Sequence, residues 1–111
     1  MSIKTILVYD VLNNENPITE EDGKKLYNEI KKEFDSNNKV IVDFSNIFSL
    51  TTAVVNNSIS AFVSDIGIKE LSNRLSITGL TDDNVKNTIN LSLSLAESIY
   101  SAKQNEITSQ D

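Results

Sequence analysis

The segment that most constrains the fold of this chain is Lys39-Val-Ile-Val-Asp43, in which three consecutive β-branched residues are closed by an aspartate. Such a run favours a short strand, and its uninterrupted apolar character favours a strand covered on both faces. A compact connection follows, and Thr51 and Thr52 stand where the next helix should begin. We therefore expect an inner strand of a layered core, with the connection after it presented to solvent.

The N-terminal third of the chain predicts one strand and one helix. Residues 5–10 read as a buried strand that ends at Asp10. Thr19-Glu-Glu-Asp22 has the form of a capping box, and its acidic residues suit the positive end of a helix dipole. The helix that it opens should end near Ser36.

The C-terminal half repeats this alternation. A second helix is predicted over residues 52–65, with Gly67 as its stop, and a third strand over residues 74–78, closed by Gly79. A last helix should begin near residue 81 and end near Ala102. Residues 1–102 are thus expected to form one domain, and residues 103–111 a flexible tail. Three strand–helix units with short connections predict an α/β fold with a mainly parallel sheet.

Composition narrows the range of functions. The 111 residues carry a net charge of −6, and ten scattered Lys and Arg residues do not suit nucleic acid or anionic membranes. The chain has no Cys and no His, which removes thiolate chemistry and the commonest general base and metal ligand. No apolar run approaches the length of a membrane span, and the N-terminus lacks the apolar core of a signal peptide. We expect a cytoplasmic bacterial protein that is not an enzyme and has no cofactor.

The motif Val40-Ile-Val-Asp-Phe-Ser-Asn-Ile47, read together with the following helix and with Leu75-Ser-Ile-Thr-Gly-Leu-Thr81, resembles a known family. It is similar to the STAS-like bacterial domains of unknown function, relatives of the anti-sigma-factor antagonist (STAS) fold. The resemblance runs from Gly23 to about Ile99. It implies a small α/β sandwich with a mixed or mostly parallel sheet and amphipathic helices. It also implies a regulatory, protein-interaction module of bacterial signalling, whose partner is a histidine-kinase-like ATPase or another signalling protein.

The resemblance points to a phosphorylation site at the start of the second predicted helix. Thr51 and Thr52 fall where the better-known antagonists have an aspartate and a phosphorylatable serine, whereas Ala53 and Val54 replace a serine–phenylalanine pair of the STAS-like domains. Phosphate on Thr52 would meet free backbone N–H groups and would add charge to a partner-binding surface. The alternative interpretation is that Thr52 is an ordinary N-cap.

Two surfaces are candidates for contact with partners. The first centres on the turn after residue 43 and on the helix start, and its candidate residues are Phe44, Ser45, Asn46, Phe48, Ser49, Asn56 and Asn57. The second is the last helix, in which Leu91, Leu95 and Ile99 widen the apolar face. Those three residues favour either a homodimer through this helix or packing beneath the N-terminal segment.

Asp10 and Asp43 support a competing hypothesis. Both are expected to end apolar strands, where two carboxylates can bind Mg²⁺ and one can accept phosphate, as in a receiver-like phosphoacceptor or a Mg-dependent enzyme. A receiver needs five strand–helix units, and only three are recognisable here. The simpler interpretation makes Asp43 a turn residue whose carboxylate accepts N–H groups from Ser45 or Asn46.

Overall fold

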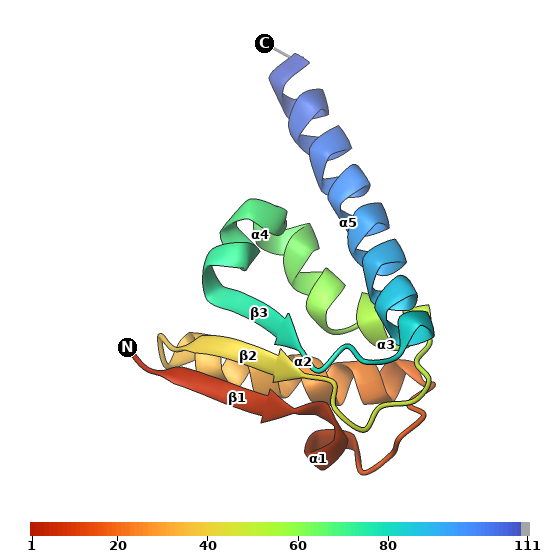
Figure 1. Ribbon diagram of the computed structural model, residues 1–111. Coiled ribbons are helices and arrows are strands. Elements are labelled where there is room, and N and C mark those ends of the chain that lie inside the picture. The colour runs from red at the N-terminus through yellow and green to blue at the C-terminus, as the bar shows by residue number, and fades with distance from the viewer. Residues whose placement is uncertain (110–111) are drawn as a thin grey trace.

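The computed structural model describes the backbone of residues 1–109 and the side chains of residues 1–105. Three strands, β1 (Ile3–Leu7), β2 (Lys39–Asp43) and β3 (Leu75–Thr78), form one parallel sheet in the order β1-β2-β3 (Figure 1). The register aligns Thr5, Ile41 and Ser76 across the three strands. The predicted α/β class and parallel sheet are confirmed, and the strand that ends at Asp43 is the inner one.

The N-terminal segment differs from the prediction. The strand stops at Leu7, and the chain turns at once into a short helix, α1 (Val8–Leu12). Val8 and Leu12 lie four residues apart on the buried side of this turn of helix. The predicted strand over residues 5–10 is therefore wrong in its second half, and Asp10 lies within α1 rather than at a strand end.

Helix α2 (Glu20–Asp35) begins at the predicted capping box. The Thr19 hydroxyl oxygen accepts the backbone N–H of Asp22 at 3.1 Å, and the Asp22 carboxylate accepts the backbone N–H of Thr19 at 3.3 Å. The helix buries Gly23, Leu26 and Ile30. Because Gly23 has no side chain, the backbone of α3 (Thr52–Asn56) approaches closely at that point.

The helix predicted over residues 52–65 is two helices, α3 and α4 (Ile59–Arg74). The Asn57 amide donates to the carbonyl of Ala53 at 2.8 Å, and the Ser58 hydroxyl donates to the carbonyl of Val54 at 2.7 Å. Such local bonds from side chain to backbone compete with continued helix, and the chain breaks between these residues. Gly67 takes the positive φ of a helix end, +82°, but the chain resumes helix after it.

The last helix, α5 (Asp83–Ser109), is 27 residues long and continues past Ala102, where it was expected to end. It packs on α4 and α3, and the ring of Tyr100 lies against Gly67. Figure 1 shows its C-terminal half leaving the body of the molecule. Leu91, Leu95 and Ile99 are each exposed by 54–55%, so the N-terminal segment does not cover them.

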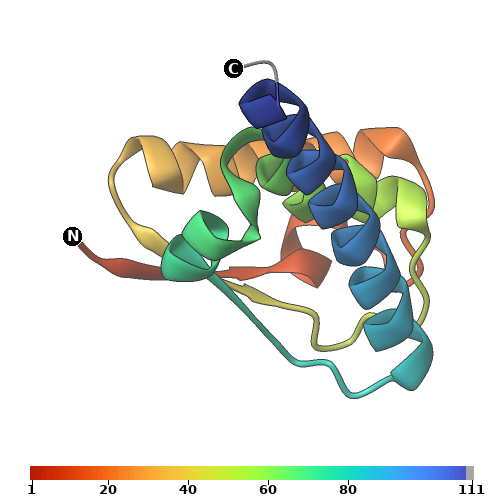
Figure 2. The same cartoon turned by 90° about the horizontal axis from the view of Figure 1, so that it is seen from above.

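Helices α2 and α4 lie over one face of the sheet (Figure 2). The chain crosses from β1 to β2 and then from β2 to β3 in the same direction across the sheet. Because both crossovers are right-handed, the long helix of each, α2 and α4, lies on the same side. That side is buried through Ile6, Val40, Val42 and Leu75, whereas Ile3 on the opposite side is 65% exposed. On that opposite side β2 itself presents Lys39, which is exposed, and Ile41, which is half-buried, so the expectation that β2 is buried on both faces is wrong.

Candidate functional site

The turn after β2 is organised by the carboxylate that ends the strand. One oxygen of Asp43, Oδ1, accepts the backbone N–H of Ser45 at 2.8 Å and the Ser45 hydroxyl at 2.7 Å. Gly79 follows β3 with φ of +75°, and a Cβ atom at this glycine would come within 2.2 Å of the same oxygen. Asp43 is thus a turn residue, bound as the simpler interpretation proposed.

The turn has an apolar underside and an exposed upper side. Phe44 and Ile47 are only 2% and 3% exposed and anchor the turn in the core. Asn46 has a positive φ of +66°, and the chain reverses direction at this residue. Phe48, two residues later, points to solvent and is 62% exposed. Phe44 is therefore removed from the candidate contact residues, because its side chain cannot reach a partner.

A second loop, over residues 13–19, supports the turn from the side. The backbone N–H of Phe48 donates to the Glu15 carbonyl at 2.8 Å, and the Ser49 hydroxyl donates to the Asn16 side-chain oxygen at 2.7 Å. The Thr51 hydroxyl donates to the carbonyl of Ile18 at 2.7 Å. These bonds join two loops that lie more than thirty residues apart in the sequence.

Sequence reasoning missed this second loop, and above all Ile18. An apolar residue just before an N-cap usually packs against the fourth residue of the helix as a hydrophobic staple. Here that fourth residue is Gly23, which offers no side chain, and Ile18 stays 62% exposed. Ile18 and Phe48 stand on the two hydrogen-bonded loops, and we call the surface formed by residues 15–18 and 45–49 the loop surface.

The structure separates the roles of the two threonines. Helix α3 begins at Thr52, with Thr51 in the N-cap position, and the Thr51 hydroxyl bonds to the other loop instead of capping the helix. The interpretation of Thr52 as an N-cap is therefore wrong. Both threonines are half-buried, and within the described residues no hydrogen bond engages the Thr52 hydroxyl.

Asn56 and Asn57 bind other helices of the protein. The Ser92 hydroxyl donates to the Asn56 side-chain oxygen, and Ser92 shares a further bond of 2.7 Å with the buried Ser60 hydroxyl. This chain of polar groups ties α3 to α4 and α5. Asn57 packs against Gly23 of α2. Both asparagines also line a shallow hollow between α2 and α4, away from the hydrogen bonds that define the loop surface.

The geometry does not assemble the site that the competing hypothesis needs. Asp10 lies in α1, so the predicted pair of carboxylates at strand ends is wrong. In the part of the chain whose side chains are described, no three acidic residues come together as a metal would require. None of the described helices is long and apolar enough to cross a membrane.

The architecture, a small parallel sheet with helices that follow each strand, defines a STAS-like α/β domain. The sequence matches the family described as "STAS-like domain of unknown function (DUF4325)" over residues 22–85, more than half of the chain, and the protein belongs to this family. The matched segment runs from the first turn of α2 to the start of α5, and ends before Ile99. Neither the curated proteins nor the solved structures contain a significant match.

Proposed function

We propose that this protein is a non-enzymatic, regulatory interaction module of bacterial signalling, and that its partner binds the loop surface. The observation that carries the proposal is the pair of exposed apolar side chains, Phe48 and Ile18, each 62% exposed on loops joined by hydrogen bonds. Aromatic side chains such as that of Phe48 are enriched in protein interfaces, where a few well-packed anchors contribute most of the binding free energy. Ser45, Asn46 and Ser49 would form the polar rim.

The fold gives this surface a fixed shape before any partner arrives. Phe44 and Ile47 hold it from below, and the bonds from Asp43 to Ser45 fix the entry to the turn. A preformed surface loses less conformational entropy on binding than a mobile loop does. The resemblance to STAS-type antagonists supports a histidine-kinase-like ATPase or another cytoplasmic signalling protein as the partner.

The proposal is tested by comparing the proteins that wild-type and variant chains retain from an extract of the encoding organism. The variants Phe48→Ser and Ile18→Ser should each reduce retention of the specific partner by at least about 10-fold, as expected for a central apolar contact. The matched control is Leu91→Ser, which removes a side chain of similar exposure, 54%, from α5. Equal retention by wild type and both loop variants, measured by quantitative mass spectrometry, would contradict the proposal.

We further infer that phosphorylation, if the module is switched, occurs on Thr52 rather than on Thr51. The Thr51 hydroxyl is already bound to Ile18, whereas the Thr52 hydroxyl is not engaged by the described residues. Phosphate would add a charge of about −1.5 to −2 beside the loop surface and change its affinity for a partner. Incubation with kinases of the same organism, followed by mass spectrometry, should find phosphate on Thr52, and modification of Thr51 alone would refute this assignment.

A further inference from the structure

One face of the sheet has no cover in the described part of the chain. Parallel sheets occur almost only with both faces covered, because the helices that connect their strands usually lie on both sides. The helices that follow β1 and β2 lie on the same face, and α5 packs on α4 and α3 rather than crossing to the other. We call the uncovered side the open face, and it is formed by Ile3, Thr5, Leu7, Lys39, Ile41, Asp43, Ser76 and Thr78.

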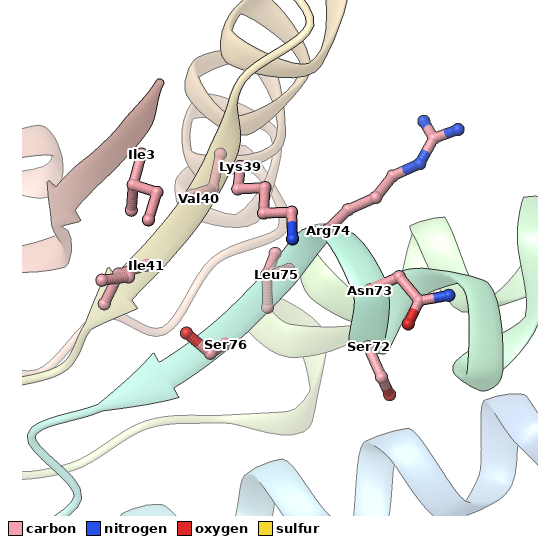
Figure 3. A pocket seen from close by; sticks show the side chains of 9 residues that line it. All are labelled: Ile3, Lys39, Val40, Ile41, Ser72, Asn73, Arg74, Leu75 and Ser76. Carbon is pink, nitrogen blue, oxygen red and sulfur yellow. The ribbon is translucent and has the colours of Figure 1, made fainter. Parts of the chain in front are cut away.

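The open face is apolar along β1 and at its centre. Ile3 is 65% and Leu7 41% exposed, at the two ends of β1, and Ile41 occupies the middle of β2 between Thr5 and Ser76. Ile3, Ile41 and Ser76 line a hollow of about 190 Å³ at the amino end of the sheet. Figure 3 shows how their side chains lie. The two exposed side chains of β1, together with the half-buried Ile41 of β2, would be buried further by a flat apolar surface of the same width.

Charges on the open face are separated along the strands. Lys39 stands at the amino end of β2, with Arg74 just before the amino end of β3, whereas Asp43 stands at the carboxyl end of β2. The Lys39 side chain is exposed, and Arg74 is about half exposed and paired with Glu70 of its own helix. Because Glu70 offsets the charge of Arg74, the face carries one positive group, Lys39, at one end and one negative group, Asp43, at the other. A copy of the face turned end to end places opposite charges over one another.

We propose that the open face binds a second copy of this chain, with the two sheets face to face and their strands antiparallel. A two-fold axis that lies between the sheets, perpendicular to the strands, passes between the two Ile41 side chains. This operation places Ile3 over the second copy's Leu7 and Lys39 over the second copy's Asp43, and each contact occurs twice. Because both copies use the same surface, this contact forms a dimer and leaves no free copy of the face to which a third chain could bind.

The area of the open face limits the affinity of the proposed dimer. Three strands about 4.8 Å apart, with five residues in β1 and β2 and four in β3 at about 3.3 Å per residue, form a patch roughly 15 Å on a side. Stable interfaces bury about 800 Å² on each partner, several times the projected area of this patch. We therefore expect a weak dimer that forms at concentrations of about 0.1 mM, and that weakens with salt because two ion pairs contribute.

The absence of Cys from the sequence permits a direct test of the geometry. Packed sheets lie about 10 Å apart, so the two thiols of an Ile41→Cys variant, on the two-fold axis, fall within reach of a short bismaleimide. This variant should form a covalent dimer far faster than the control Leu95→Cys, whose thiol stands on the exposed side of α5. Equal cross-linking rates at the two positions would overturn the proposed arrangement.

Sedimentation equilibrium up to about 1 mM protein tests the contact without a cross-linker. Ile41→Glu and Lys39→Glu should each weaken the dimer by at least 10-fold, since the first buries a carboxylate at the centre and the second places it over Asp43. The far-ultraviolet circular dichroism should not change. A wild-type protein that stays monomeric overturns the proposal. A dimer that survives Ile41→Glu but is lost in Leu95→Lys also overturns it, and assigns dimerisation to α5.

Discussion

Gly79, the residue that follows the neighbouring strand β3, lies against the turn that starts at Asp43. Replacing Gly79 by alanine tests this close contact. The residue has φ of +75°, a conformation that L side chains rarely adopt. An alanine Cβ would also lie 2.2 Å from Asp43 Oδ1 and 2.6 Å from the backbone nitrogen of Ser45. Those two atoms form the hydrogen bond that starts the turn, so the clash falls on the turn itself.

The cost has two parts. A left-handed conformation disfavours a residue with a Cβ by about 1–2 kcal/mol. Separating Ser45 from the Asp43 carboxylate loses hydrogen bonds to a charged group, and because Ser45 is exposed and water can replace its partner, about 1–2 kcal/mol is expected for this part. The sum for Gly79→Ala is a loss of about 2–4 kcal/mol in the free energy of unfolding, a large share of the stability of a small domain.

Urea denaturation followed by circular dichroism measures this loss directly. The control is Asn46→Gly, at a position in the same turn with φ of +66°, where glycine relieves backbone strain and the change should stay within about 1 kcal/mol. A Gly79→Ala protein less than about 1 kcal/mol below wild type would refute the reasoning, because neither the backbone strain nor the contact with Asp43 would then be present.

Three further substitutions test the scaffold by denaturation. Leu26→Ala removes a fully buried side chain from α2 and should cost about 2–5 kcal/mol, and a smaller loss would mean that the core is not closed at α2. Thr19→Ala removes one half of the capping box and should cost about 0.5–2 kcal/mol, with Thr19→Ser as the matched control that retains the bond. In Gly67→Ala the new Cβ would lie 2.7 Å from the ring of Tyr100. The loss of unfolding free energy caused by Gly67→Ala should therefore be smaller in a Tyr100→Ala background, which lacks the ring. Strictly additive losses in the double variant would contradict the contact.

Local signals account for the parts of the fold that the sequence predicts well. The capping box at Thr19 and the β-branched run before Asp43 each act within a few residues, and both lie where they were expected. The turn at Asp43 follows the same logic, since a carboxylate two residues before an N–H group commonly accepts it. The class of fold follows because the pattern of alternating units limits the choice of topology.

The secondary-structure predictions fail where contacts with distant parts of the chain determine the local conformation. Residues 5–10 contain one uninterrupted apolar run, Ile6 to Tyr9, and nothing in that run shows that Val8 will be buried together with Leu12 on one turn of helix. The break between α3 and α4 did carry a signal, because Asn57 and Ser58 are residues that bond to nearby backbone. The exposure of Ile18 also had a signal in the sequence. A residue in the position of a hydrophobic staple has no side chain to pack against when the fourth residue of the helix is glycine, as Gly23 is here.

The position of the turn after β2 was predicted, but the side chains that it exposes were not. The sequence places the turn at the carboxyl edge of the inner strand, and the structure agrees. It does not distinguish Phe44, which enters the core, from Phe48, which leaves it, because four residues of irregular chain have no periodicity to decide the direction. Nor does it show that the loop at residues 15–18 joins the turn, since that pairing depends on the whole sheet.

The parallel register also has a consequence for how the chain folds. Ile3 pairs with Lys39 and Val40 pairs with Leu75, so the two strand pairings close segments of 36 and 35 residues (39 − 3 and 75 − 40). The described strands pair only in parallel and offer no hairpin to nucleate the sheet, so each closure must overcome its loop entropy before the ladder forms. The helices can form on a microsecond timescale, and the strand pairings should set the overall folding rate.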